Sequence, residues 1–116
     1  MSVTIYHNPA CSKSRKTLAL IRSHGIEPVI VEYLKSPPDA ETLRTLLSFL
    51  GLNAAQLARQ KETAWSDAGL STNSSDADII AAMVMEPKLI ERPIVVCGER
   101  AVLGRPPENV NELLAG

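Results

Sequence analysis

Cys11 is the residue in this sequence whose type and surroundings most clearly favour chemistry. It follows a short β-rich run at residues 3–6 and stands at the start of a segment with helical periodicity. At a helix N-terminus, the backbone N–H groups without helical partners and the helix dipole both favour an anion. Lys13, Arg15 and Lys16 add positive charge directly after the thiol. Such surroundings lower a thiol pKa from ~8.5 to roughly 3.5–7.5, so we expect Cys11 to be largely thiolate at neutral pH; a merely packed cysteine usually has apolar neighbours.

The residues near Cys11 limit what its thiolate can do. The segment from Cys11 to Ser14 is a C-x-x-S motif, in which Ser14 takes the place of the second thiol of a redox C-x-x-C pair. The site can therefore attack a substrate but cannot close a local disulfide, so a second thiol must come from outside or from Cys97. We expect Cys97, at the end of an apolar run, to have a plain core role. His7 either orients the loop and helps set the thiol pKa, or is simply a hydrogen-bonded loop residue.

The first third of the chain predicts a β-α-β unit around this thiol. The run at residues 3–6 is the first strand, and Leu18 and Ile21 mark the buried face of a helix that ends at Gly25. The almost wholly apolar run at residues 29–34 predicts an interior strand buried on both faces. Two strands joined by a helix should be parallel, with a right-handed crossover.

The middle of the chain predicts a helical insert at about residues 39–88. The stretch Ser36-Pro37-Pro38-Asp39 breaks the chain and offers N-caps, and an apolar stripe at helical spacing follows it up to Gly51. A second short helix is predicted over residues 52–61, followed by an irregular stretch over residues 63–73. Residues 75–78 resemble a capping box, which begins a helix that Pro87 ends.

The last third predicts two strands and a helix. Residues 94–97 form a buried strand, residues 98–100 a turn, and residues 101–103 an antiparallel return strand. Pro106-Pro107 opens a final helix. The fold class is therefore α/β, a thioredoxin-like mixed sheet (βαβ … ββα) with a helical insert between the halves, in a single domain over residues 1–116.

Three arginines stand where this fold could place them around the thiol. Arg92 precedes Pro93, and in thioredoxin-like folds a proline at that position has a cis peptide bond, which would hold Arg92 close to the nucleophile. Arg105 lies between a glycine and two prolines, and Arg59 lies near the end of the second predicted insert helix. Arginine stays charged and binds tetrahedral oxyanions through two donors, so three of them around a thiolate would form an anion site. The alternative is that they are ordinary surface charges.

The composition is that of a soluble globular domain, with 45% hydrophobic and 22% charged residues in 116. Twelve Lys and Arg against 13 Asp and Glu give a net charge of −1, which provides no basic field for nucleic acid. The longest apolar run, Ile79–Met85, has seven residues, whereas a membrane-spanning helix needs about 20. Two cysteines without an export signal indicate reduced thiols and a cytoplasmic protein, and the Cys and His residues lack zinc-ligand spacing.

The motifs resemble a known family over nearly the whole chain and in the same order. They are similar to ArsC-type arsenate reductases of the glutaredoxin-coupled class, in its short, chromosomally encoded bacterial branch. The resemblance implies a thioredoxin-like domain with a helical insert. The matching segments are His7-Asn8-Pro9-Ala10-Cys11-Ser12-Lys13-Ser14-Arg15, Tyr33-Leu34 with Pro37-Pro38, Glu91-Arg92-Pro93-Ile94-Val95-Val96 and Gly104-Arg105-Pro106. The plasmid-type enzymes usually carry Gly-Thr where this chain has Ser12-Lys13.

The resemblance also implies roles for individual residues. Cys11 would be the nucleophile that bonds to arsenic, in a reaction with arsenate that uses glutathione as co-substrate and glutaredoxin as partner and releases arsenite. No metal and no bound cofactor would be needed, and a monomer is expected. The substrate-binding residues would be Arg59, Arg92 and Arg105, and the supporting residues would be His7, Asn8, Ser14, Arg15 and Pro93.

Two other function classes stay open at this point. Spx-type transcription regulators share the fold and an R-P-I strand, and they bind RNA polymerase instead of converting a substrate. Their N-terminal motif usually lacks H-N-P and often carries C-x-x-C, so the intact H-N-P at residues 7–9 favours the enzyme. The other alternative is an oxidoreductase that acts on another thiol substrate, which the missing second cysteine of the motif disfavours.

Overall fold

The computed structural model describes residues 2–115 and divides into two compact units. The first unit contains the chain up to Ser36 and from Arg92 onwards, and the second contains Pro37–Glu91. The predicted helical insert corresponds to the second unit. The prediction that both units act as a single domain stays a prediction.

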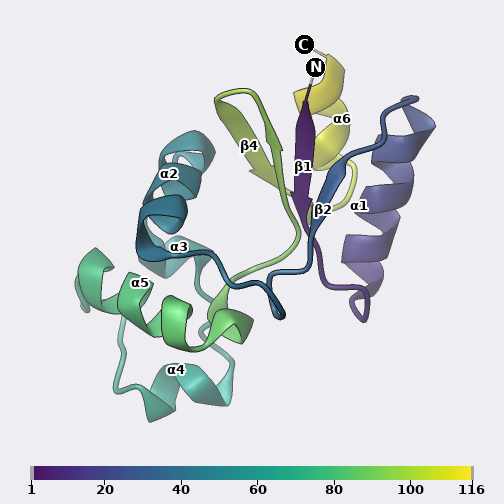
Figure 1. The fold of residues 1–116 in the computed structure, drawn as a ribbon. Helices are drawn as coiled ribbons and strands as arrows, with labels where there is room; N and C mark the ends of the chain where they lie inside the picture. The colour runs from purple at the N-terminus through teal and green to yellow at the C-terminus, as the bar shows by residue number, and fades with distance from the viewer. Residues whose placement is uncertain (1, 116) are drawn as a thin grey trace. The chain divides into compact units, whose positions relative to one another are not determined.

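The first unit is a four-stranded mixed sheet with two helices (Figure 1). Its strand order is β2-β1-β3-β4, with β1 parallel to β2 and antiparallel to β3, and with β3 antiparallel to β4. This is the predicted thioredoxin-like arrangement. The elements are β1 (Val3–Tyr6), α1 (Ser12–Ser23), β2 (Val29–Val31), β3 (Ile94–Cys97), β4 (Arg100–Leu103) and α6 (Asn109–Ala115).

The core of the first unit lies between one face of the sheet and the helices α1 and α6. In the register of the sheet, Ile5 on β1 lies opposite Val95 on β3, and both are fully buried. The helix α1 buries residues at the 3.6-residue period of one helical face. The buried cluster consists of Val3, Ile5, Leu18, Ile21, Val95, Val110 and Leu113. Because β1 and α1 both belong to this cluster, packing fixes the junction between them, where Cys11 lies.

The strand β2 differs from the prediction. It is the edge strand of the sheet and ends at Val31, and Val29 and Ile30 are 58% and 39% exposed. After Val31 the chain turns, with the carbonyl of Glu32 accepting the N–H groups of Lys35 and Ser36. The interior position belongs to β1, because β3 pairs with its second edge. An apolar run alone does not distinguish an edge strand from an interior one.

The last helix also begins later than predicted. The helix α6 starts at Asn109 because Pro106 and Pro107 lie in a turn, in which the Asn109 N–H donates to the Pro106 carbonyl (3.1 Å). The Asn109 side chain donates to the carbonyls of Leu103 (3.1 Å) and Arg105 (3.3 Å). This amide therefore fixes the loop that carries Arg105.

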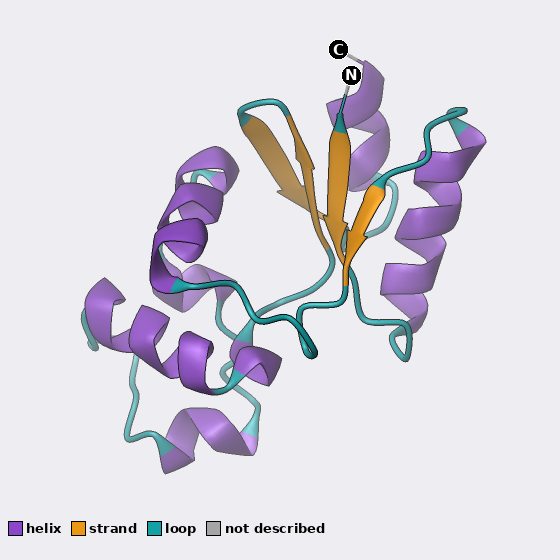
Figure 2. Cartoon of the chain, viewed as in Figure 1, coloured by secondary structure: helices purple, strands orange, loops and turns teal. Residues whose placement is uncertain are grey.

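The second unit is helical (Figure 2). As predicted, Asp39 caps its first helix through the Thr42 N–H, and Gly51 ends that helix in the left-handed conformation. Ser75 caps the last long helix, as predicted. Leu43, Leu47 and Met83 are among the residues buried inside this unit. The elements are α2 (Ala40–Leu50), α3 (Ala54–Leu57), α4 (Thr63–Asp67), α5 (Asp76–Met85) and the 3₁₀ turn η1 (Pro87–Leu89).

Two boundaries in the second unit correct the predictions. The helix predicted over residues 52–61 is only α3, because Ala58 leaves it to form a β-bridge with Ile90. The stretch predicted as irregular, residues 63–73, contains α4, whose Trp65 is buried. In residues 2–115, no helix is both long enough and apolar enough to cross a membrane.

Candidate active site

The loop before α1 presents Cys11 as the N-cap residue of that helix. Its backbone is extended (φ −94°, ψ 123°), and its carbonyl accepts the N–H of Arg15 (3.0 Å). The loop closes on Asn8, whose carbonyl accepts the N–H of Cys11 (3.0 Å) and whose side-chain oxygen accepts the N–H of Ala10 (3.0 Å). The thiol therefore lies at the end of β1 and the start of α1, as the sequence predicted.

Ser14 holds this loop from inside the helix. It is fully buried, and its hydroxyl oxygen accepts the N–H of Asn8 (3.1 Å) and lies 2.6 Å from Nδ1 of the buried His7. The position of the second thiol in a C-x-x-C motif is thus occupied by a group that fixes the loop.

The surroundings of the histidine in this pair favour its neutral form. Burial lowers the pKa of His7; Glu32 partly offsets this effect, and the charges of Arg22 and Arg15 add to it. A neutral imidazole and a hydroxyl can share one hydrogen bond, with one group donating and the other accepting. His7 is therefore a hydrogen-bonded loop residue, one of the two readings that the sequence left open. This contact does not exclude the other reading, that His7 also tunes the thiol.

Arg15 supports the same loop from outside. Its Nη1 donates to the carbonyl of Pro9 (2.9 Å). The Arg15 side chain therefore spans the outside of the loop. This contact is separate from any effect of its charge on the thiol.

The pKa of Cys11 is lower than that of an ordinary thiol. Burial raises it, but hydrogen bonds from the backbone of Ser14, from the Arg92 side chain and from the backbone of Lys13 lower it, as does the charge of Arg92. The direction agrees with the prediction. The causes that lower it are the helix N-terminal amides, as predicted, and Arg92, which takes the part that the sequence had given to the cationic side chains after the cysteine.

Arg92 reaches the thiol from the loop before β3. The Arg92–Pro93 peptide bond is cis, as the sequence predicted. The Pro93 carbonyl accepts the N–H of Gly104 (2.9 Å), which begins the pairing of this segment with the end of β4. Cys11 and Arg92 are thus brought together from positions far apart in the sequence.

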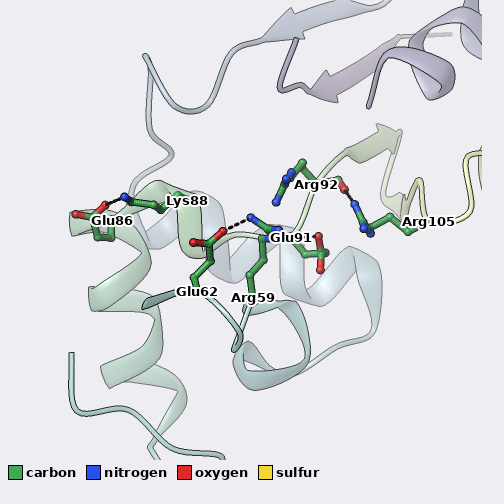
Figure 3. A network of polar contacts seen from close by, with 7 residues as sticks. All are labelled: Arg59, Glu62, Glu86, Lys88, Glu91, Arg92 and Arg105. Carbon is green, nitrogen blue, oxygen red and sulfur yellow. Dashed lines mark hydrogen bonds and ion pairs between the residues drawn. The ribbon is translucent and has the colours of Figure 1, made fainter. Parts of the chain in front are cut away.

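Arg105 supports the segment that carries Arg92. Its Nη1 donates to the carbonyl of Arg92 (3.2 Å) (Figure 3), and the Arg105–Pro106 bond is also cis. The prediction had Arg105 converging on the sulfur. The contact described here ties the Arg105 guanidinium to the backbone of Arg92. The approach of Arg105 to the sulfur and its role in anion binding stay predictions.

Arg59 belongs to the second unit and lies among carboxylates. Its Nη1 donates to Oε1 of Glu62, and its Nε lies 3.6 Å from Oε1 of Glu91 (Figure 3). Its approach to Cys11 stays a prediction.

Sequence reasoning missed Thr17, which adjoins the site. Thr17 is fully buried, its hydroxyl donates to the Lys13 carbonyl (2.8 Å), and it packs where a Cβ on Gly104 would stand. A polar residue on the buried face of α1 was the available signal for Thr17. Cys97 is partly buried against the core of the first unit, in agreement with the predicted packing role.

Sequence reasoning also missed Glu62 and Glu91. The spacing of Arg59 and Glu62, three residues apart, could have suggested the first pair. The pairing of Arg59 with Glu91 is tertiary.

The described residues show which chemistry the site offers. Among residues 2–115, no group of three or more His, Cys, Asp or Glu side chains could hold a metal ion. The site offers a partly buried thiol whose pKa is lowered by hydrogen bonds from helix N-terminal amides and from an arginine. Together with the sheet order and the cis-proline, this defines a thioredoxin-like protein with a cysteine of lowered pKa beside an arginine.

Comparison with known proteins identifies the family. The sequence model of the ArsC family matches residues 6–113, and the chain belongs to this family. Among curated relatives, it is 54% identical to "Uncharacterized protein YfgD" of Escherichia coli (strain K12), over 97% of this chain and 96% of that protein. It is 48% identical to an arsenate reductase of Rhizobium meliloti, over 98% of this chain and 82% of that protein. Among solved structures, an arsenate reductase from Vibrio cholerae has a TM-score of 0.93 at 51% identity, covering 97% of each chain.

Proposed function

We propose that this protein is an arsenate reductase in which the Cys11 thiolate attacks arsenate held by arginines. The observation that carries the proposal is the contact between Arg92 and a Cys11 thiol of lowered pKa, since it combines a nucleophile with an oxyanion donor. Membership of the ArsC family and the arsenate reductases among its relatives supply the substrate.

In the first step, the Cys11 sulfur forms a bond to arsenic and one arsenate oxygen leaves as water after taking up protons. Arg92 donates to the oxyanion and balances the charge that builds up on it. Arg105 and Arg59 serve as the further anion-binding arginines. The amides of Lys13 and Ser14 stabilise the thiolate before attack and again when it is released.

Electrons come from two external thiols, because Ser14 replaces the local second cysteine. Glutathione displaces a further oxygen as water and forms a bond to arsenic. Glutaredoxin then attacks the glutathione sulfur, forming a mixed disulfide as the As–S electron pair passes to arsenic and reduces it from the pentavalent to the trivalent state. Hydrolysis of the Cys11–arsenic bond releases arsenite and restores the thiolate. The reaction uses no metal and no bound cofactor, and we propose that a cytoplasmic monomer carries it out.

Turnover with arsenate tests this function. The purified protein should release arsenite when glutathione and glutaredoxin are both present, and omission of either should stop release. Cys11→Ser should be inactive, whereas Arg44→Lys, on an exposed position of α2, should match the unmodified chain. No arsenite release with the complete system, together with capture of RNA polymerase, would instead identify an Spx-type regulator.

A further inference from the structure

Arg59 lies in a cluster of charges whose sum is negative. It contacts Glu62 through Nη1 and faces Glu91 through Nε, so one guanidinium is shared by two carboxylates. The three side chains are 27%, 29% and 24% exposed, respectively, so solvent only partly screens their charges. A dianion that approaches this cluster meets one more negative than positive charge.

The geometry of a guanidinium makes an incoming oxyanion compete with the two carboxylates for the same nitrogens of Arg59. Its two bidentate edges are formed by Nε with one terminal nitrogen and by the two terminal nitrogens together. Either edge therefore uses Nε or Nη1, and each of these nitrogens already faces a carboxylate. An oxyanion can bind Arg59 in bidentate fashion only if one carboxylate yields.

Glu62 and Glu91 differ in how they are held. The Glu91 N–H donates to the Leu57 carbonyl (2.9 Å), and the Arg59 N–H donates to the Leu89 carbonyl (2.7 Å), so the bridge fixes both backbones. Glu62 lies in the turn that leads into α4, three residues after Arg59, and its Oε1 is much closer to the guanidinium than that of Glu91. Glu91 is thus part of the frame around Arg59, and Glu62 is the partner that an anion has to displace.

We propose that Glu62 is a specificity-determining residue that competes with the oxyanion for Arg59 and so sets the affinity of the protein for its anionic substrate. The proposal rests on the function proposed above, because it takes Arg59 to be an anion-binding residue. In the resting state Glu62 occupies Nη1 of Arg59, and in the anion complex an oxyanion oxygen takes its place. A weakly bound or singly charged anion does not displace Glu62, whereas a dianion does.

Calorimetric binding of arsenate, and separately of sulfate, tests the proposal without turnover. Glu62→Gln keeps the length and shape of the side chain and removes its charge. It should lower the dissociation constant of both anions about tenfold, the effect of removing one nearby like charge at partial burial. Glu86→Gln is the matched control, because Glu86 is also paired with a cation, Lys88 at 3.9 Å, in the same unit. This control should leave the dissociation constants unchanged.

Two further variants separate competition from general charge and from structural effects. Glu91→Gln removes the same charge from the same cluster but leaves Glu62 on Nη1, so its effect should be clearly smaller than that of Glu62→Gln. In an Arg59→Ala background, Glu62→Gln should have no effect on anion affinity. In arsenate turnover, Glu62→Gln should lower KM while kcat changes less than twofold.

The opposite results would overturn the assignment. Equal tightening by Glu62→Gln and Glu91→Gln would show a general charge effect, and weaker or unchanged anion binding by Glu62→Gln would show that Glu62 supports Arg59 instead of competing with the anion. Absence of arsenate and sulfate binding in both the unmodified chain and Glu62→Gln would also refute it. Failure of arsenate turnover with intact, Glu62-dependent anion binding would refute the proposed reduction and leave the role of Glu62 standing.

Discussion

Gly104 stands at a close approach between α1 and the segment that positions Arg92. A Cβ at this position would lie 2.5 Å from Oγ1 and 2.9 Å from Cγ2 of Thr17, and 2.7 Å from Cγ of Pro93. Neither neighbour yields easily, since Thr17 is fully buried and hydrogen-bonded to Lys13 while Pro93 is a rigid ring paired with Gly104 itself. We therefore predict that Gly104→Ala forces the segment carrying Arg92 away from α1.

The size of the effect follows from two opposing terms. Forcing one methyl group into a filled space costs about 1–3 kcal/mol. Alanine also restricts the unfolded chain, which stabilises the folded state by about 0.4–1 kcal/mol. At the middle of both ranges, the net loss in the free energy of unfolding is roughly 1.3 kcal/mol, and it reaches roughly 2.6 kcal/mol when neither neighbour yields. Because Arg92 lowers the pKa of the Cys11 thiol, its displacement should also raise that pKa.

Urea unfolding and the pH dependence of Cys11 alkylation measure the two effects. Gly51→Ala is the control: Gly51 has φ +69° and open space around a Cβ, so alanine there is destabilising through backbone conformation alone. It should leave the alkylation midpoint unchanged. Thr17→Ala removes two of the three clashing atoms and should restore part of the lost stability in the Gly104→Ala chain.

Two results would refute this reasoning. A Gly104→Ala protein as stable as the parent, with an unchanged Cys11 midpoint, would mean that the contact around residue 104 relaxes at no cost. A destabilised Gly104→Ala protein that Thr17→Ala does not rescue would mean that the clash with α1 is not the cause.

Other predictions concern the thiol and its surroundings. Arg92→Lys keeps the charge but loses the planar fork, and should lower the rate of arsenate turnover by a factor of roughly 10²–10³. Arg44→Lys should leave the rate unchanged. If Arg92→Lys has as little effect as Arg44→Lys, Arg92 does not take part in the reaction. Cys97→Ala should retain most of the turnover, and a folded but inactive variant would make Cys97 the resolving thiol. Alkylation of Cys11 should titrate below the ~8.5 of a free thiol, and a midpoint at that value would contradict the contacts described for it. The pKa of His7 is lower in the folded state, so the unfolded chain takes up the proton first as the pH drops. The free energy of unfolding should therefore fall as the pH drops from 6.5 through the folded-state pKa. Urea titrations across that range should show a flatter pH dependence for His7→Asn.

Local patterns in the sequence predicted those parts of the structure that depend on local forces. Asp39 and Ser75 cap their helices as expected, since a side-chain oxygen reaches backbone N–H groups only three residues away. The turn between β3 and β4 and the position of Cys11 at a helix N-terminus follow from the same short-range chemistry. The length of α3 did not, because the bridge between Ala58 and Ile90 ends it, and that pairing joins segments far apart in the chain.

The sequence by itself determined the position of Cys11 at a helix N-terminus and the order of strands and helices, because both are specified by residue type and near neighbours. The cis-proline beside Arg92 was predicted from the fold class that this order indicates. Only the tertiary structure decided that Arg105 donates to the carbonyl of Arg92 and that Arg59 is shared by two glutamates. The physical reason is that a guanidinium on a long, flexible side chain pairs with whichever oxygen or sulfur the folded backbone brings within reach. The sequence therefore specifies which residue carries the charge, and the packing of distant segments decides which group pairs with it.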